Sequence, residues 1–336
     1  MKRFGGLFPQ VVSFENLHDA FKKAAQGKRD QPEVIRYQYN LEGNLLALRE
    51  HLLAGGYRFG PYHAFDIFDP KPRLIVAAPF ENRVVHHAMC NVMTPIFEKT
   101  FITDSYACRE GKGTHAAVLR LQQFMRDCPD GYVLQCDIRK YFPSISHATL
   151  KTLIERKIKD PQLLALVNAV IDSSPVEAGR GPGMGLPIGN LTSQLFANIY
   201  LDPFDHFVKQ DLHGNRYVRY VDDFVLICDD KSRLFEIKAI LKAFLSTNLG
   251  LDLHPDKCHV IPVPAGITFL GYRVWTTRRR VKTATMVRLR RREKKLREAF
   301  WRGLVTAEEY ARTMSSSLGH IKWGDEKGVV KAQLFS

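Results

Sequence analysis

The sequence predicts an α+β protein with more than one lobe, because short apolar strands alternate with amphipathic helices over 336 residues. A chain of this length exceeds the usual size of a single hydrophobic core. Hydrophobic residues make up 45% of the chain and charged residues 25%, which is typical of a folded globular protein and excludes wholesale disorder.

The composition also points to a compartment. The six cysteines are scattered without a Cys-x-x-Cys pair, so reduced thiols are expected rather than disulfides or a zinc site. No apolar run reaches the length of a signal-peptide core or a membrane-spanning helix. We therefore expect a cytoplasmic protein without a membrane partner.

The first part of the chain is predicted to be mainly helical, since leucines recur at helical spacing within residues 14–54. Strand-like runs at 62–68 and 73–78 flank the turn Asp69-Pro70-Lys71-Pro72, which predicts a β-hairpin with a basic rim. Helical spacing returns over 81–97. A loop rich in glycine and charge, residues 105–115, then leads into a helix predicted over 114–125.

The second part predicts a strand over 132–136 that leads into Asp137, and then helical segments. Helices are expected over 146–172, 190–207 and 232–247. Strands are expected over 218–227, which has a central Asp-Asp, and over 251–253 and 267–275. The composition then changes to a basic helix, so we place a domain boundary near Trp275.

The net charge of +14 implies a polyanionic partner. Residues 276–300 hold eleven basic and two acidic residues and so contribute +9 of the total. A solvated helix face is the alternative, but such faces usually interleave both signs, so binding to a phosphate backbone is favoured.

Three carboxylates are candidate metal ligands. Asp222 and Asp223 lie between two apolar runs, which predicts a buried hairpin with both acids at its tip, whereas the pair at 229–230 lacks this context. Asp137 ends an apolar strand 85 residues earlier. Two Mg²⁺ ions held between such acids would stabilise the attacking and leaving oxygens of a phosphoryl transfer. A solvated turn for the pair and a helix cap for Asp137 are the alternatives.

Tyr220-Val221-Asp222-Asp223, together with Asp137 and the aromatic Phe142 five residues after it, resemble the palm motifs of reverse transcriptases. Four other blocks follow the order of that family: Pro70–Ile75, Ser105–His115, Gly250–Lys257 and Phe269–Tyr272.

The resemblance implies a right-hand polymerase with fingers, a ferredoxin-like palm and a helical thumb. Residues 1–130 would form mainly fingers with N-terminal helices. Residues 131–275 would form the palm, with 146–187 partly returning to the fingers. Residues 276–336 would form the basic helical thumb, and no RNase H, maturase or endonuclease domain is expected.

The resemblance also implies a role for particular residues. Asp137, Asp222 and Asp223 would be catalytic and, with the backbone carbonyl of Ile138, would bind two Mg²⁺ ions, for which Mn²⁺ could substitute. Contacts to the incoming dNTP are expected from Lys71, Arg73, Phe142, Ile188, Gly189 and Lys257. Contacts to nucleic acid are expected from Arg109, Gln194, Gly271, Tyr272, Arg288, Arg291, Arg292 and Lys295. Phe142 would exclude a ribose 2′-hydroxyl, and the alternative is a core Phe142 with Tyr141 as the gate.

The stretch 185–194 discriminates within the family. Most reverse transcriptases have Gln-Gly-x-x-x-Ser-Pro there, whereas this chain has Ile188 and Gln194 at the first and last positions. This form resembles the reverse transcriptases of diversity-generating retroelements, within the group II intron-like superfamily of bacteria and phages. Glutamine can hydrogen-bond the bound nucleotide and isoleucine cannot, which predicts reduced fidelity. Alternatively, Ile188 fills a gap in the core.

This resemblance implies an RNA-directed DNA polymerase that copies a template-repeat RNA with errors at adenines, for mutagenic retrohoming and targeted gene diversification. Its partners would be template RNA, primer and cDNA, dNTPs and a small, basic, oligomeric accessory protein, in a bacterial, archaeal or phage-infected host cell. The alternatives are a group II intron-like or defence-associated reverse transcriptase of ordinary fidelity, and an inactive RNA-binding scaffold. The presence of all three acids disfavours the scaffold.

Overall fold

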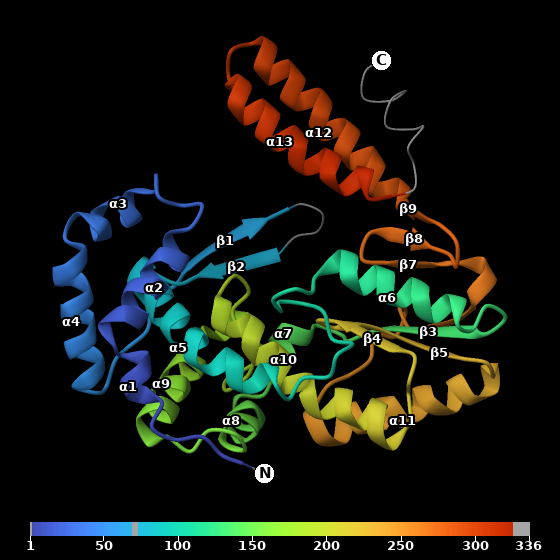
Figure 1. Cartoon of the computed structure of the whole chain (residues 1–336), viewed down its shortest axis with the longest axis horizontal. Helices are drawn as coiled ribbons and strands as arrows, with labels where there is room; N and C mark the ends of the chain where they lie inside the picture. The colour runs from blue at the N-terminus through green and yellow to red at the C-terminus, as the bar shows by residue number, and fades with distance from the viewer. Residues whose placement is uncertain (1, 69–72, 325–336) are drawn as a thin grey trace.

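A computed structural model describes residues 2–68 and 73–324. Its centre is a four-stranded antiparallel sheet, hereafter the central sheet, with the order β4-β5-β3-β6 (Figure 1). The strands are β3 (Tyr132–Asp137), β4 (Tyr217–Tyr220), β5 (Asp223–Cys228) and β6 (His259–Pro262).

Helices separate the first strand from the second and the third from the last, which gives the order β-α-β-β-α-β. The helices after β3 are α7 (Tyr141–Ser144), α8 (His147–Glu155), α9 (Pro161–Asp172) and α10 (Leu191–His206), and α11 (Lys231–Leu249) precedes β6. Short 3-10 helices, η1 and η3, lie at Val176–Ala178 and Val263–Ala265, and a π-helical turn, η2, lies at Phe207–Asp211. This chain order and strand order define a ferredoxin-like unit, as the family resemblance implied.

Both faces of the central sheet are covered, because successive strand residues point to opposite sides and both sets are apolar. Leu134 and Phe224 belong to the core under α10 and α11. Val133 and Val225 belong to a second core, which includes residues of α6 (Thr114–Arg126). Figure 1 shows α11 below the sheet and α6 above it. Two separate cores therefore meet at one sheet.

The N-terminal part is helical, apart from one hairpin. It comprises α1 (Phe8–Val11), α2 (Phe14–Ala25), α3 (Pro32–Tyr39), α4 (Leu41–Leu53), β1 (His63–Ile67), β2 (Arg73–Ala77) and α5 (Phe80–Glu98). Ser13 caps α2 by accepting a hydrogen bond from the N–H of Asn16. Asp160 caps α9 and also accepts from the N–H groups of Leu7 and Phe8, which joins α1 to α9.

The C-terminal part begins with a small sheet, β7 (Ile267–Phe269), β8 (Tyr272–Val274) and β9 (Arg279–Val281). It ends in two helices, α12 (Thr283–Trp301) and α13 (Ala307–Lys322), which pack against each other beside the small sheet (Figure 1). Thr306 and Glu309 form a capping box at the start of α13. No helix in the described part of the chain is long and apolar enough to cross a membrane.

The structure differs from the sequence prediction at several boundaries. Residues 279–281 form a strand rather than the start of a helix, so the small sheet continues past Trp275. A boundary at residue 130 would separate α6 from β4, β5 and β8, which it contacts. Residues 251–253 form one isolated bridge, and the strand that completes the central sheet lies instead at 259–262.

The approach to α10 depends on a close backbone contact at Gly185. Its N–H donates to the carbonyl of Ile145 at 2.8 Å, and its carbonyl is 2.8 Å from the Nε2 atom of His147. Its φ is +88°, and a Cβ atom there would lie 2.4 Å from the Cα of Gly179. The loop therefore requires glycine for both conformation and space.

Gly185→Ala is expected to lower the free energy of unfolding by at least about 3 kcal/mol, because a left-handed alanine costs about 1 kcal/mol and overpacking adds about 2 more. Gly183→Ala is the matched control, since Gly183 has a φ of +71° but nothing within 4 Å of the added Cβ. We expect it to cost about 1 kcal/mol. Urea unfolding of both variants measures the difference, and equal losses would contradict the close contact.

Candidate active site

Strands β4 and β5 are joined by a two-residue turn, Val221–Asp222. Val221 has a φ of 55°, in the left-handed region that β-branched residues rarely adopt. The main-chain N–H of Ile138 donates to the Asp222 carbonyl at 3.2 Å. Arg219 Nη1 donates to the Val221 carbonyl at 3.0 Å. Both carbonyls of the turn are therefore hydrogen-bonded to neighbouring parts of the sheet.

The candidate acids meet at the end of the central sheet. Asp137 and Asp223 are directly opposite each other across β3 and β5, and Asp222 lies in the adjoining turn. Burial raises the pKa of Asp223 to about 7, with contributions from the charges of Asp222 and Asp137, while Lys257 opposes the rise. Lys257 Nζ is 2.8 Å from Asp137 Oδ2. This excess of negative charge favours a bound cation.

A cavity of about 1390 Å³ opens over the acids. Its lining comes from the central sheet, the β7–β8 turn and the first half of α12, and carries both acids and bases. The acids, their neighbours and the basic residues on it are Asp137, Ile138, Arg139, Lys140, Asp222, Asp223, His254, Lys257, Lys282, Arg288 and Arg291. Such a cavity can accept a phosphorylated ligand whose charge is balanced from one side by lysine and arginine.

The donor set fits Mg²⁺. Carboxylate oxygens are the hard ligands that this ion prefers, and the Ile138 carbonyl belongs to a residue that lines the same cavity. Within residues 2–68 and 73–324, no three His, Cys, Asp or Glu side chains form a complete metal-binding cluster by themselves. Mg²⁺ usually keeps several waters and binds through one or two carboxylates and substrate phosphates, so the acids present are sufficient. Bound ions would stabilise charge on the oxygens of a phosphoryl transfer.

The residues predicted to contact the dNTP are placed unevenly. Lys257 lines the cavity beside Asp137. Lys71 lies outside the described residues, and Arg73 begins β2 opposite Ile67. Ile188 and Gly189 adjoin β2 and do not line the cavity.

The two aromatic residues after Asp137 are in different environments. Tyr141 is buried, and its hydroxyl donates to the carbonyl of Ala197 at 2.5 Å. Phe142 is half-buried, and its carbonyl accepts from the N–H of Leu186 at 3.1 Å. The structure thus gives Tyr141 the core position, while Phe142 packs partly buried against the same core and does not line the cavity.

One face of α12 turns towards the cavity, as the lining residues Ala284, Val287, Arg288 and Arg291 recur at helical spacing. Arg292 and Lys295 are exposed and lie four residues after Arg288 and Arg291. They extend the predicted basic face along the helix, although they do not line the cavity itself.

Three other predicted nucleic-acid contacts lie elsewhere. Tyr272 is fully buried, with its hydroxyl 3.3 Å from His115 Nε2, so it does not fit a direct contact; Gly271 and Leu270 of the preceding turn reach the cavity instead. Arg109 Nε donates to Glu98 Oε1 at 2.7 Å, inside the protein. Gln194 is exposed and lines a separate cavity of about 690 Å³ beside α5.

Several residues that line the cavity were not predicted from the sequence. Arg139 and Lys140 directly follow Asp137, so their position in the motif was an available signal. Lys282 belonged to the basic run but was given no role. The role of Arg219, which is buried beneath the turn and does not line the cavity, was not predicted either, because an arginine in a strand sequence gives no sign that it is buried.

The fold and the arrangement of acids define a class of nucleic-acid polymerase. A solved structure of apo telomerase from Candida tropicalis matches with a TM-score of 0.51 and 12% identity, over 67% of this chain and 49% of that chain. At this identity the likeness shows the fold alone, which is that of a right-hand polymerase. A family model described as reverse transcriptase (RNA-dependent DNA polymerase) matches residues 68–274. The chain belongs to this family and is a reverse transcriptase.

Two bacterial proteins are similar to this chain over more than half of its length. The protein YkfC of Escherichia coli is 27% identical over 327 residues, which cover 85% of this chain and 81% of YkfC. The group II intron-encoded protein LtrA of Lactococcus lactis is 23% identical over 266 residues, covering 60% of this chain and 44% of LtrA. The matched region thus spans less than half of LtrA. Reverse transcriptases generally use divalent metal ions and bind a nucleic-acid template and primer.

Asp222→Asn is expected to reduce dNTP incorporation by at least about 1000-fold, because a neutral amide binds a divalent cation poorly. Template binding should change less than about twofold, since no phosphate contact is removed. Primer extension on an RNA template and a fluorescence binding assay measure the two quantities.

Asp229→Asn is the matched control for this prediction. Asp229 belongs to the other Asp-Asp pair, at the far end of β5, and forms an ion pair with Arg216 at 3.3 Å. Its variant should incorporate dNTPs at the normal rate. Normal incorporation by Asp222→Asn would remove this acid from the reaction.

Replacing Arg288 and Arg291 together with glutamine should weaken binding of an RNA–DNA duplex. The logarithm of the association constant decreases linearly with the logarithm of the salt concentration, and the size of this slope should decrease by about one for each lost phosphate contact. Arg297→Gln is the control, since Arg297 lies 3.6 Å from Glu293 on another side of α12. Titrations between about 50 and about 200 mM salt measure the slopes. An unchanged slope in the double variant would show that this face of α12 does not bind the duplex.

Proposed function

We propose that this chain is the reverse transcriptase of a diversity-generating retroelement, which makes cDNA with errors at template adenines. In the reaction, the primer 3′-hydroxyl attacks the α-phosphate of a dNTP and pyrophosphate leaves. Asp137, Asp222, Asp223 and the Ile138 carbonyl would hold two Mg²⁺ ions, which would supply charge stabilisation at the reacting oxygens when bound. The single observation that carries the mutagenic role is the placement of Ile188.

Ile188 is fixed against the hairpin strand β2. Its carbonyl accepts from the N–H of Val76 at 3.0 Å. The Asn190 side chain accepts from the N–H of Ala78 at 3.2 Å and donates to the Val76 carbonyl at 3.1 Å. A Cβ atom on Gly189 would lie 3.0 Å from Ile75 Cγ2. Position 188 therefore has little freedom to move away from the hairpin.

An aliphatic side chain at this fixed position supports reduced base selection. Isoleucine offers neither donor nor acceptor, whereas glutamine offers both. A hydrogen bond is worth about 1 kcal/mol, so its absence reduces discrimination between base pairs by about fivefold. Ile188 is half-buried, which leaves part of its side chain available to a bound nucleotide.

The structure also suggests how the regions cooperate in synthesis. We propose that β1, β2 and the N-terminal helices act as fingers, the central sheet as the palm, and α12 with α13 as the thumb. Arg73 and Lys71 would bind the triphosphate, and Phe142 would exclude ribonucleotides. Gln194 would act at the template side of the fingers, whereas the Arg109 side chain is buried against Glu98 and Ser105.

The charge and the resemblance to reverse transcriptases of diversity-generating retroelements support a proposal about partners. The net charge of +14 favours binding of template RNA, primer and cDNA. We propose in addition a small basic accessory protein, oligomeric, that binds both the polymerase and the RNA in the cytoplasm of a bacterial, archaeal or phage-infected cell. A gel shift of the polymerase with the template-repeat RNA, with and without that protein, tests this partner.

A second function is a group II intron-like or defence-associated reverse transcriptase of ordinary fidelity. The similarity to LtrA, a group II intron-encoded protein, favours it. The two functions differ in the products they make, because ordinary fidelity yields cDNA without an excess of errors at one template base.

Sequencing of cDNA made on a defined RNA should find errors at template adenines at least about tenfold above those at other bases. Ile188→Gln should reduce this excess by about fivefold, and Ile188→Leu, which adds no hydrogen-bonding group, should leave it unchanged. Low errors at all four template bases would support the second function. A wild-type excess that both variants leave unchanged would assign the errors to another residue.

A further inference from the structure

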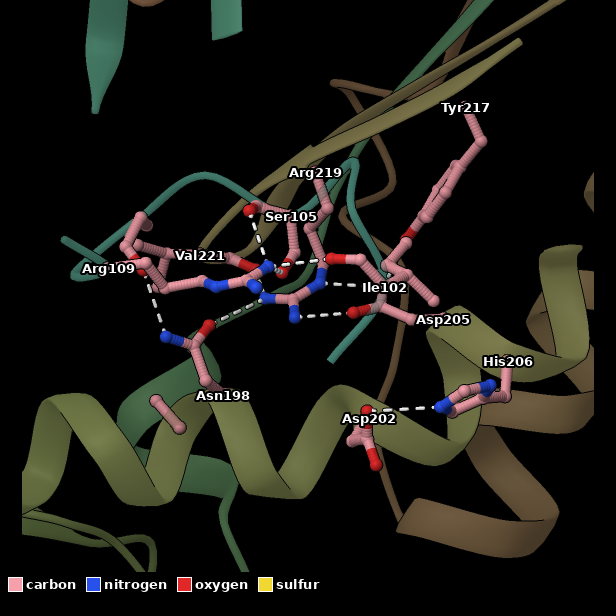
Figure 2. A network of polar contacts seen from close by, with 12 residues as sticks. Ile102, Ser105, Arg109, Asn198, Asp202, Asp205, His206, Tyr217, Arg219 and Val221 are labelled. Atoms are coloured by element: carbon pink, nitrogen blue, oxygen red, sulfur yellow. Dashed lines mark hydrogen bonds and ion pairs between the residues drawn. The ribbon is translucent and has the colours of Figure 1, made fainter. Parts of the chain in front are cut away.

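Arg219 is a buried cation beneath the catalytic turn. It lies on β4, its exposed fraction is 0%, and that of its partner Asp205 on α10 is also 0%. Figure 2 shows the guanidinium of Arg219 between α10 and the turn that contains Val221. A fully buried charge is costly unless hydrogen bonds and an opposite charge compensate it, so the partners of Arg219 matter for its role.

All three nitrogens of the guanidinium donate hydrogen bonds. Nε donates to Asp205 Oδ1 at 2.7 Å and Nη2 donates to Asp205 Oδ2 at 2.6 Å. Nη1 donates to Asn198 Oδ1 at 3.2 Å and to the Val221 carbonyl at 3.0 Å. The Tyr217 hydroxyl donates to Asp205 Oδ1 at 2.8 Å. The polar groups thus form a connected network that ends at the turn (Figure 2).

The main chain of Arg219 is held as well. Its N–H donates to the Asp104 carbonyl and its carbonyl accepts from the N–H of Tyr106, both at 3.0 Å, which pairs it with Ser105 as in a parallel strand. Arg109 Nη1 in turn donates to the Ser105 carbonyl at 2.8 Å. Hydrogen bonds therefore fix both ends of this residue: its main chain on the segment around Ser105 and its guanidinium on the carboxylate of Asp205.

A buried ion pair is weak grounds for stability, because apolar side chains of similar volume often replace such a pair without loss. An apolar side chain could not, however, donate to the Val221 carbonyl. That bond acts on a residue in a conformation which its branched side chain disfavours.

We propose that Arg219 is a positioning residue: by holding the Val221 carbonyl, it keeps the turn in the conformation that directs Asp222 and Asp223 towards Asp137. The proposal rests on the assignment of these acids as metal ligands, and not on the mutagenic role. Asn198 and Asp205 are seven residues apart on one face of α10, so this helix supplies both supports of the guanidinium.

Arg219→Lys tests the proposal because it keeps the charge. A lysine can pair with Asp205, but it lacks the planar fork that reaches Asp205, Asn198 and the turn together. Arg120→Lys is the matched control, since Arg120 also pairs with a buried aspartate, Asp104, at 2.8 Å but does not contact the turn.

We expect the single-turnover rate of Arg219→Lys to fall about 100-fold, as a displacement of about 1 Å at a reacting centre can do. The Mg²⁺ concentration for half-maximal rate should rise several-fold, while the dissociation constant of template and primer stays within about twofold. Arg120→Lys should match the wild type in its single-turnover rate, its Mg²⁺ requirement and its dissociation constant for template and primer. Circular dichroism confirms that each variant is folded.

Rescue separates positioning from a general structural role. Glycine adopts left-handed backbone without steric cost, so Val221→Gly added to Arg219→Lys should restore about tenfold of the lost rate. A rate for Arg219→Lys equal to that of Arg120→Lys would overturn the proposal. So would a lowered rate with an unchanged Mg²⁺ requirement and no rescue.

If Arg219→Lys does not fold, Asn198→Ala decides the question, because it leaves the Arg219–Asp205 pair intact while removing one support of Nη1. It should raise the Mg²⁺ requirement about threefold, and an unchanged requirement in the folded variant would overturn the proposal. Asp222→Asn keeps the outcomes distinct: if it incorporates dNTPs normally, the acid assignment has failed rather than the role of Arg219.

Discussion

The opposition of Asp137 and Asp223 across β3 and β5 is the constraint on which the rest of the site depends. Like charges directly opposite each other destabilise a sheet, so the register must be held elsewhere. The pairs Val133–Ile227 and Leu134–Leu226 hold it, since their side chains are buried in the two cores on opposite faces. A shift by one residue would move each of these side chains to the wrong face. The apolar middle of the ladder thus keeps two acids together at its end.

The parts of the fold that follow from local patterns could be predicted. The ferredoxin-like arrangement was implied by the family resemblance, but its strands β3, β4 and β5 are apolar runs and α10 and α11 have helical periodicity, so these elements could be predicted from local patterns. Strands β6 and β9 could not, because His259 and Arg279 begin short segments that become strands only by pairing with β3 and β8. Tertiary contacts decide such edges, and local propensity does not.

The residues of the candidate site also fall into those that local sequence patterns predict and those that depend on tertiary contacts. The acids stand out because carboxylates between apolar runs are rare, and they do line one cavity. Tyr272 was assigned by resemblance, although the burial alternation of β8 puts Tyr272 and Val274 inside and leaves Arg273 partly exposed. Arg219 had no local signal, because its burial requires Asp205, which lies on another element 14 residues away.

Helix α10 connects the residue proposed for base selection with the residues proposed to position the metal ligands. Its N-terminal side is tied to the hairpin through Asn190, and Asn198 and Asp205 farther along support Arg219. The bond that fixes position 188 uses the Ile188 carbonyl, so a new side chain there leaves the backbone of α10 where it is. The contacts of Arg219, in contrast, act on the turn itself. The proposed loss of fidelity therefore needs no loss of catalytic geometry, because the two functions share a helix but use different atoms.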